Sequence, residues 1–341
     1  TLVTMKLIKK IIYWKLSLQF YFITFLRNKF YDFGFLKSYS FDIPVISVGN
    51  LTVGGTGKTP MVEFLINHFS EKYNIGVLSR GYKRKSKGFI LASDKDDADS
   101  IGDEPFQYYS KFKNITVAVD KKRRRGINKL IEHGVNLIIL DDAFQHRKVI
   151  PSYSILLSDY SNLYYNDYLM PRGTLRESIM GYKRADSIII TKCPTNLSEK
   201  DKYSIKSLIK PTEKQNIFFS TIKYSDKLFS STNSIGISKL TGKKVNLVTG
   251  IVNSKPLIKF LKNNGLDVNH FEYADHHDYL EKDITDFSGP LIITTEKDYA
   301  KLRKFDIENL YYLPINMDIL KSDEFFEVLA DKIIDWQLIN K

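Results

Sequence analysis

The segment 49–60 carries the residue types of a phosphate-binding loop, in the order Gly-Asn-Leu-Thr-Val-Gly-Gly-Thr-Gly-Lys-Thr-Pro. An apolar run typical of a strand, Val45–Val48, precedes it, and a helical pattern, Met61–Phe69, follows it. In such a loop the glycine N–H groups curl around a polyphosphate, and the helix N-terminus favours negative charge. The residues expected to contact nucleotide phosphates are Gly54, Gly55, Thr56, Gly57, Lys58 and Thr59.

Lys58 and Thr59 have separate expected roles in this loop. The Lys58 ammonium can reach the β- and γ-phosphates, and the Thr59 hydroxyl can bind Mg²⁺. Thr52 departs from the usual pattern, which has glycine at that position. The alternative is a glycine-rich turn beside an unrelated lysine, but the flanking strand and helix favour the phosphate loop.

A second apolar run, Leu137–Leu140, ends in the paired carboxylates of Asp141 and Asp142. This is the expected form of the acidic partner of a phosphate loop, which holds Mg²⁺ directly or through water. Many buried strands end in Asp, so this pair of carboxylates indicates a Mg²⁺ site only because the chain also contains the phosphate-loop motif. Gln145 and His146 add polar side chains at the same strand end.

Two further polar clusters each allow more than one interpretation. Asp103 and Glu104 stand just before a helical pattern, where they would cap the helix or act as a catalytic base and a Mg²⁺ helper. Their spacing alone favours the cap. The run Ala274–Asp278 reads Ala-Asp-His-His-Asp, which suits an acid/base site or a polar loop better than a metal site, because its histidines are adjacent. Thr295–Asp298 is typical of a helix N-cap with an acidic first turn.

Basic residues are in excess, with Lys+Arg 51 against Asp+Glu 39 and a net charge of +12. This balance favours an anionic partner, which is nucleic acid, an anionic membrane surface or a phosphorylated substrate. Arg80 and Tyr82 follow one strand pattern, and other arginines lie in 121–125 and 170–177. These segments would bind anions or form solvated basic loops, and the sequence alone slightly favours the loops.

The N-terminal segment 5–36 is basic and rich in aromatic residues. Its longest uncharged stretch, Leu16–Leu26, is shorter than the roughly 20 residues that a membrane-spanning helix needs. A basic, aromatic helix over this segment would lie in the interface of a membrane or pack on the protein's own core. Both interpretations can be true at once, if different faces of the helix make the two contacts. Residues 1–4 precede Met5, which we expect to be the natural start, and we expect no secretion signal.

Strand-like runs alternate with helical patterns along the rest of the chain, which predicts a mostly parallel sheet with helices on both faces. The single cysteine, Cys193, rules out an intramolecular disulfide and fits a reducing compartment. The expected organisation is a basic N-terminal helix, a P-loop domain, a β-hairpin linker and a smaller C-terminal α/β domain. Their expected ranges are 1–36, 37–212, 213–235 and 236–341. The linker strand is expected over 216–223.

The ordered set of motifs resembles the tetraacyldisaccharide 4′-kinase family, the lipid A 4′-kinases of Gram-negative bacteria. The loop at 47–60 matches in full, and Thr52 is usual for this family. Ala143 departs from it, because the family usually has glycine there, and 170–174 departs from the Pro-Ala-Gly-Pro-like run that is usual in the family. The other matching segments are 79–82, 102–105, 141–146, 175–177, 274–276 and 295–298.

The resemblance implies an α/β P-loop fold and transfer of the ATP γ-phosphate to the 4′-hydroxyl of an acylated disaccharide-1-phosphate. Asp103 would be the base, assisted by His276 from the second domain, so that domain closure assembles the site. The other implied assignments are Lys58 and Asp142 in catalysis; Thr59, Glu104, Asp141 and Asp142 on Mg²⁺; Arg123, Arg176 and Gln145 on ATP; and Arg80, Tyr82 and His146 on the sugar.

An acylated substrate stays in the bilayer, so the resemblance also implies peripheral binding to the cytoplasmic face of the bacterial inner membrane. No nucleic acid and no obligate protein partner are expected. A competing hypothesis is a P-loop GTPase of regulatory or metallochaperone type. Its guanine-specificity element would be Thr191–Pro194, which lacks the terminal Asp. Another is a nucleic-acid-binding ATPase, which the charge favours but no motif supports.

Overall fold

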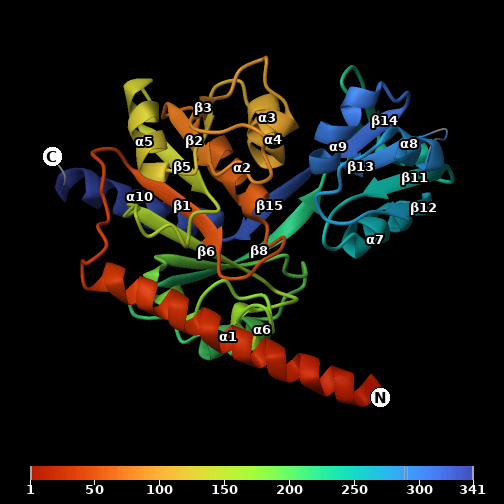
Figure 1. Cartoon of the computed structure of the whole chain (residues 1–341). Helices are drawn as coiled ribbons and strands as arrows, with labels where there is room; N and C mark the ends of the chain where they lie inside the picture. The colour runs from red at the N-terminus through yellow and green to blue at the C-terminus, as the bar shows by residue number, and fades with distance from the viewer. Residues whose placement is uncertain (1, 288, 290, 340–341) are drawn as a thin grey trace. The chain divides into compact units, whose positions relative to one another are not determined.

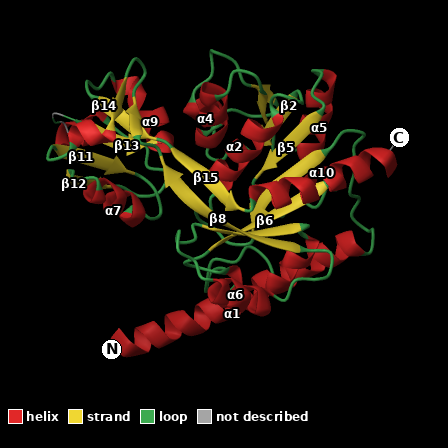
Figure 2. Cartoon of the chain, turned by 180° about the vertical axis from the view of Figure 1, so that it is seen from behind, coloured by secondary structure: helices red, strands yellow, loops and turns green. Residues whose placement is uncertain are grey.

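The computed structural model describes residues 2–287, 289 and 291–339, and the ends of the expected domains at residues 1 and 340–341 lie outside them. The chain forms two compact units, which we describe separately. The first unit consists of residues 1–80, 114–222 and 317–341, and the second of residues 81–113 and 223–316. Figure 1 traces the chain, and Figure 2 shows its helices and strands from behind.

The first unit is built on part of a large sheet, in which the strands of this unit run in the order β15-β8-β7-β6-β1-β5-β2-β4. Each neighbouring pair from β8 to β4 is parallel. Central strands such as β1 and β5 are buried along their whole length, which explains their apolar composition. The strands are β1 (Val45–Asn50), β2 (Ile75–Ser79), β4 (Thr116–Val119), β5 (Leu137–Asp141), β6 (Tyr153–Asp159), β7 (Ser187–Thr191), β8 (Asn216–Tyr224) and β15 (Ile315–Leu320).

Helices pack on this sheet because each presents an apolar stripe to it. The helix α2 contacts β1 and β5, α5 contacts β2 and β4, and α10 contacts β6. In parallel sheets, ligands bind at the carboxyl ends of the strands, and the loop after β1 lies at that edge. The helices of this unit are α1 (Leu2–Asp32), α2 (Lys58–Phe69), α5 (Arg123–Glu132), α6 (Glu199–Ile209) and α10 (Ser322–Ile339).

The second unit has a smaller sheet in the order β10-β9-β14-β13-β11-β12. Its core contains Leu228, Leu247, Leu261 and Ile293, each fully buried. Its strands are β9 (Lys227–Phe229), β10 (Ser234–Gly236), β11 (Lys244–Thr249), β12 (Asp267–Glu272), β13 (Ile292–Thr295) and β14 (Leu310–Leu313), with β3 (Ile90–Leu91) outside that sheet. Its helices are α3 (Ala98–Ile101), α4 (Asp103–Lys111), α7 (Lys255–Asn263), α8 (Glu281–Phe287) and α9 (Glu296–Leu302).

Hydrogen bonds hold one face of α1 against the rest of the first unit. Ser17 Oγ donates to the Leu169 carbonyl over 2.9 Å, and Arg27 donates to the Gln145 carbonyl over 2.6 Å. The helix also leaves large apolar side chains exposed, including Trp14 at 54% and Ile23 at 66%. The side chains of residues 1–9 lie outside the description. No helix of the described residues has both the length and the apolar character needed to cross a bilayer.

The compact units interleave along the chain, unlike the linear domains expected from the sequence. Residues 81–113, expected within the kinase domain, pack with the second unit, and residues 317–341 pack with the first. β8, expected in a connecting hairpin, pairs in parallel with β7 and extends the large sheet. The physical reason is that strand pairing and burial between distant segments leave no mark in the local pattern of a sequence. The predicted domain boundaries remain a prediction.

Candidate active site

The segment that enters the phosphate loop forms a short ladder with residues 174–176. Val53 N–H donates to the Thr174 carbonyl over 2.8 Å, and Arg176 N–H donates to the Leu51 carbonyl over 2.7 Å. Thr52, paired with Leu175, is only 4% exposed. This extended, buried position suits a β-branched side chain and gives a physical reason why Thr replaces the usual glycine.

The tip of the loop is fixed by neighbouring polar side chains. Gly57 has a φ of 86°, which an L side chain rarely adopts, and it directly precedes α2. Thr191 Oγ1 donates to the Thr56 carbonyl over 2.8 Å, and the Lys192 ammonium donates to the Gly55 carbonyl. Asn50 Nδ2 donates to Thr56 Oγ1 over 2.8 Å. These bonds draw two loop carbonyls toward the protein, which suits a loop that must present N–H groups to an anion.

Asp142 lies beside the loop lysine and is shared by two cations. Its Oδ1 is 3.8 Å from Lys58 Nζ and 2.7 Å from Arg176 Nη1. Burial alone would raise the pKa of Asp142, but the charges of Lys58 and Arg176 outweigh it and lower the pKa below its usual value. The structure therefore brings together Lys58, Asp142 and Arg176, three of the residues assigned from the sequence, with Thr59 next to them in the chain.

Arg123 is only 2% exposed, which the sequence did not reveal. Its guanidinium donates to the Asp120 carbonyl over 2.6 Å and to the Asp141 carbonyl over 3.1 Å. Burial lowers its pKa to about 10. Arg123 therefore links the end of β5 to the segment after β4 through these two carbonyls. Its expected contact with ATP stays a prediction.

Gln145, His146 and Arg80 occupy different environments around this strand end. Gln145 Nε2 donates to the Asn50 carbonyl over 2.8 Å and to Glu177 Oε1 over 3.1 Å, so it holds the loop in place. Burial, together with the charges of Arg123, Arg27, Lys148 and Arg80, lowers the pKa of His146 to about 4. Its Nε2 is buried with no partner among the described residues. Arg80 itself is exposed.

The second unit contains a carboxylate–imidazole pair. Asp103 Oδ2 is 2.9 Å from His276 Nδ1, although 173 positions separate them in the chain. Asp103 opens α4 and is 9% exposed. Burial alone would raise its pKa, but the contacts with His276 and Lys301 lower it. We expected these two residues to come from different domains, and both belong to the second compact unit of the structure; the predicted domains themselves stay a prediction.

Glu104 and Tyr82 complete the surroundings of His276. Glu104 Oε1 is 3.9 Å from His276 Nε2, and the Tyr82 ring meets the imidazole edge-on with centroids 5.4 Å apart. His276 has a positive φ of 56°, and Lys83 Nζ donates to its carbonyl over 3.3 Å. The expected helix cap is wrong, because Gly102 is the N-cap of α4 and neither carboxylate caps it; both lie in its first turn and face a histidine from a distant loop.

Sequence reasoning missed Lys301, which is 8% exposed and 3.0 Å from Asp103 Oδ2. The available signal was its position in α9, one turn after Asp298, which is fully buried. The predicted N-cap of this helix is confirmed, since Thr295 Oγ1 accepts from Asp298 N–H over 3.1 Å. Sequence reasoning also missed that Lys192 contacts the phosphate loop at the Gly55 carbonyl. We had considered Lys192 only as part of a guanine-specificity element.

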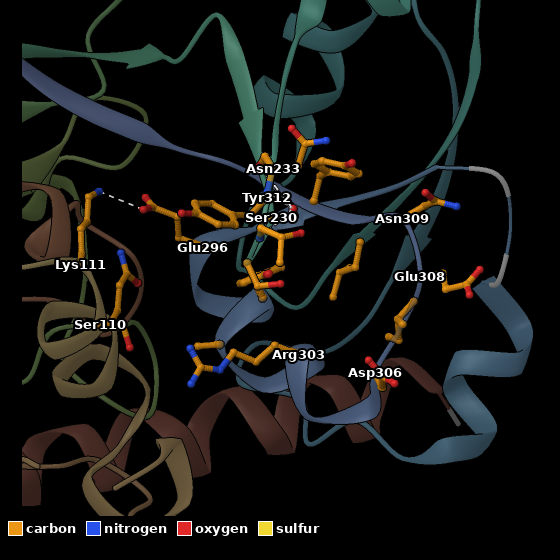
Figure 3. Close-up of a pocket in the computed structure, with 18 of the residues that line it drawn as sticks. Ser110, Lys111, Ser230, Asn233, Glu296, Arg303, Asp306, Glu308, Asn309 and Tyr312 are labelled. Carbon is orange, nitrogen blue, oxygen red and sulfur yellow. Dashed lines mark hydrogen bonds and ion pairs between the residues drawn. The ribbon is translucent and has the colours of Figure 1, made fainter. Parts of the chain in front are cut away.

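A cavity of about 780 Å³ also lies in the second unit, and Figure 3 shows the residues that line it. It is lined by side chains of α4 and α9, the β9–β10 turn and the segment 306–312. The ion pair between Lys111 and Glu296, 2.9 Å long, lies at its edge (Figure 3). Asp103 and His276 are not among its lining residues. The cavity is therefore distinct from the carboxylate–imidazole pair.

The described residues contain no group of three or more His, Cys, Asp or Glu side chains placed to hold a metal ion. Mg²⁺ differs from structural metals because it keeps several waters and binds one or two carboxylates together with substrate phosphates. The Thr59 hydroxyl and the Asp142 carboxylate next to Lys58 are of the chemistry that such an ion requires.

Known proteins resemble this chain over nearly its whole length. The family model for tetraacyldisaccharide-1-P 4′-kinase matches residues 9–334. The tetraacyldisaccharide 4′-kinase of Flavobacterium johnsoniae is 43% identical over 95% of this chain and 96% of its own. That of Bacteroides thetaiotaomicron is 40% identical over 87% and 86%.

A solved structure agrees with these sequence matches. The crystal structure of LpxK from Aquifex aeolicus in complex with ATP is 30% identical, with a TM-score of 0.78, and the match covers 94% of this chain and 98% of that one. These findings confirm the resemblance seen in the motifs and decide against a regulatory GTPase. The chain therefore belongs to the tetraacyldisaccharide-1-phosphate 4′-kinase family, the ATP-dependent kinases of lipid A biosynthesis.

Proposed function

We propose that this chain transfers the γ-phosphate of ATP to the 4′-hydroxyl of tetraacyldisaccharide-1-phosphate, with Asp103 as the general base. The contact of 2.9 Å between Asp103 and His276 is the observation that carries the proposal. A buried carboxylate paired with an imidazole has the form of an acid/base site, and nothing about capping a helix requires the histidine. The phosphate loop of the first unit supplies the donor site.

On the donor side, the loop N–H groups and Lys58 bind the β- and γ-phosphates of ATP. Arg176, 2.7 Å from Asp142, stabilises the charge that develops as the phosphoryl group leaves ADP. Thr59 and Asp142 would hold Mg²⁺, with Asp141 and Glu104 as the remaining expected carboxylates. Bound there, Mg²⁺ would neutralise phosphate charge. Gln145 contributes by holding the Asn50 backbone at the base of the loop.

On the acceptor side, Asp103 accepts the proton of the 4′-hydroxyl as the new O–P bond forms and the bond to ADP breaks. The lowered pKa of Asp103 keeps it ionised near neutral pH, so it is ready to accept a hydrogen bond from the hydroxyl. A weak base is sufficient, because in a loose phosphoryl-transfer transition state the attacking oxygen carries little new charge. His276 shares the proton, and Tyr82, Arg80 and His146 are the residues expected to contact the sugar.

The direct test of this proposal is phosphoryl transfer from γ-labelled ATP to tetraacyldisaccharide-1-phosphate in detergent micelles. We expect a labelled bisphosphate product with ATP and Mg²⁺, and no product when EDTA removes the metal ion. GTP in place of ATP serves as the nucleotide control. If the intact protein forms no labelled lipid with any nucleotide, the proposed reaction is wrong.

We also propose that α1 docks on an anionic membrane surface, where the acylated substrate resides. Its exposed apolar residues bury hydrocarbon in the interface, and its basic residues are attracted to anionic lipid. The apolar set tested here is Ile11, Trp14, Phe22 and Phe25, which are exposed by 49%, 54%, 53% and 39%.

Changing these four residues to Ser is expected to weaken binding to vesicles of anionic phospholipid at least tenfold. The reason is that fully burying one large apolar side chain contributes roughly 1.5–3 kcal/mol to the free energy of binding. Flotation of the protein with vesicles measures the effect. A matched control replaces Tyr203 and Leu208 of α6, exposed by 74% and 59%, with Ser, and it is expected to float like the parent. Unchanged flotation of the α1 variant would rule out this docking surface.

A further inference from the structure

Lys301 is a buried cation that the proposed mechanism does not yet use. It lies in α9, and its side chain is 9% exposed. Holding an ammonium group away from water is costly unless it is paired and hydrogen-bonded. Its immediate partners show where that cost is offset, and they all lie in the second unit, around the carboxylate–imidazole pair.

The Lys301 ammonium contacts the carboxylate of that pair and the backbone of the residue after its histidine. Its Nζ is 3.0 Å from Asp103 Oδ2, and it donates to the His277 carbonyl over 3.1 Å. The Asp278 carboxylate is 3.8 Å away but 83% exposed, so it adds little. One group therefore links the carboxylate of Asp103 to the backbone that follows His276.

These contacts determine which oxygen of Asp103 is available. Both of its polar contacts within the described part of the chain, with His276 Nδ1 at 2.9 Å and with Lys301, fall on Oδ2. Two donors on one oxygen fix the rotation of the carboxyl group. They leave Oδ1 as the oxygen that can accept a hydrogen bond from a substrate hydroxyl.

We infer that Lys301 is a positioning residue for phosphoryl transfer, which holds the Asp103 carboxylate and the His276 loop so that Oδ1 faces the acceptor hydroxyl. This inference rests on the proposed role of Asp103 as base. Lys301 does not itself touch the reacting atoms. Its effect is on the orientation of the base, and misplacement by about 1 Å can cost on the order of 100-fold in rate.

The chain offers a matched control for a purely structural role. Two ion pairs join α4 to α9, Asp103 to Lys301 at one end and Lys111 to Glu296, 2.9 Å apart, at the other. If Lys301 only held the two helices together, replacing Lys111 would have a similar effect. If Lys301 positions the base, the two substitutions must differ in kcat.

The experiment compares Lys301→Met with Lys111→Met in the lipid kinase assay. We expect Lys301→Met to lower kcat by about 10- to 100-fold with the KM for ATP unchanged. Lys111→Met is expected to keep kcat within about threefold of the parent. Lys301→Arg keeps the charge and is expected to recover part of the loss. Equal kcat values for the two Met variants, at matched thermal stability, would overturn the inference.

A double-mutant cycle separates this inference from the proposed function. If Lys301 acts through Asp103, Lys301→Met should lower kcat little further in an Asp103→Asn background, because coupled residues are non-additive. Independent, multiplicative losses would contradict the positioning role. Full activity of Asp103→Asn alone would instead refute the proposed base, and inactivity of the parent would refute the proposed reaction, so the three failures are distinguishable.

Discussion

Asp103→Asn is expected to lower kcat for transfer to the lipid acceptor by about 100- to 10,000-fold, the usual contribution of a general base. Asn has the same shape and still accepts hydrogen bonds from His276 and Lys301, so the fold of the second unit should persist. It has no carboxylate oxygen to take the hydroxyl proton. The measurement is steady-state kinetics with both substrates varied.

ATP binding should be unaffected in this variant, because the residues proposed to bind the ATP phosphates are those of the loop, Lys58 and Arg176, and Asp103 is not among them. Calorimetric titration with a non-hydrolysable ATP analogue measures this directly. The matched control is Asp99→Asn, the same change at a nearby carboxylate that pairs with Lys85 over 2.6 Å. It should retain full activity. A kcat within threefold of the parent for Asp103→Asn would exclude this residue as the base.

The donor site could be predicted from the sequence because its signals are local. An apolar strand, glycines and a helix follow one another within 45–69, and the structure places β1 and α2 there. The acidic end of β5 could be read in the same way. Such segments depend on contacts between near neighbours, which a residue pattern records.

The acceptor side depended on contacts that no local pattern records. Asp103 and Glu104 alone favoured a helix cap, and the contact with His276 spans 173 positions. Lys301 looked like an ordinary helix lysine, because only packing of α9 against α4 shows which face is buried. Arg123 looked like part of a solvated basic run, yet it is 2% exposed. Burial is decided by the fold as a whole.

Thr52 shows how a sequence departure can be explained by the structure. From the residues alone it was an irregular phosphate loop, and the family resemblance showed only that it recurs. The structure adds a cause, since residues 51–53 pair with 174–176 and bury the threonine. Arg176 belongs to the same ladder, and its guanidinium pairs with Asp142. One backbone pairing therefore fixes the conformation of the loop and places a cation beside it.

Lys58→Met is expected to lower kcat/KM for ATP by about 100- to 1,000-fold, the cost of removing one preorganised charge from a transition state. Lys58 is 17% exposed at its side chain and lies 3.8 Å from Asp142 and 3.5 Å from Asn50 Oδ1. Asp142 keeps Arg176 at 2.7 Å when the lysine is lost, so the local fold should survive. The loss should fall mainly on kcat, because charge develops on the phosphates as the bond to ADP breaks.

Lys58→Arg distinguishes charge from geometry in the same assay. A guanidinium keeps the positive charge but is planar and larger than an ammonium, so it cannot occupy the same place in a tight loop. We expect Lys58→Arg to remain at least tenfold impaired. Lys202→Met, which removes a partly buried lysine of α6 paired with Glu199 over 2.6 Å, is the matched control and should behave like the parent. If Lys58→Met lost less than threefold, the loop would have to bind its phosphates through backbone N–H groups alone.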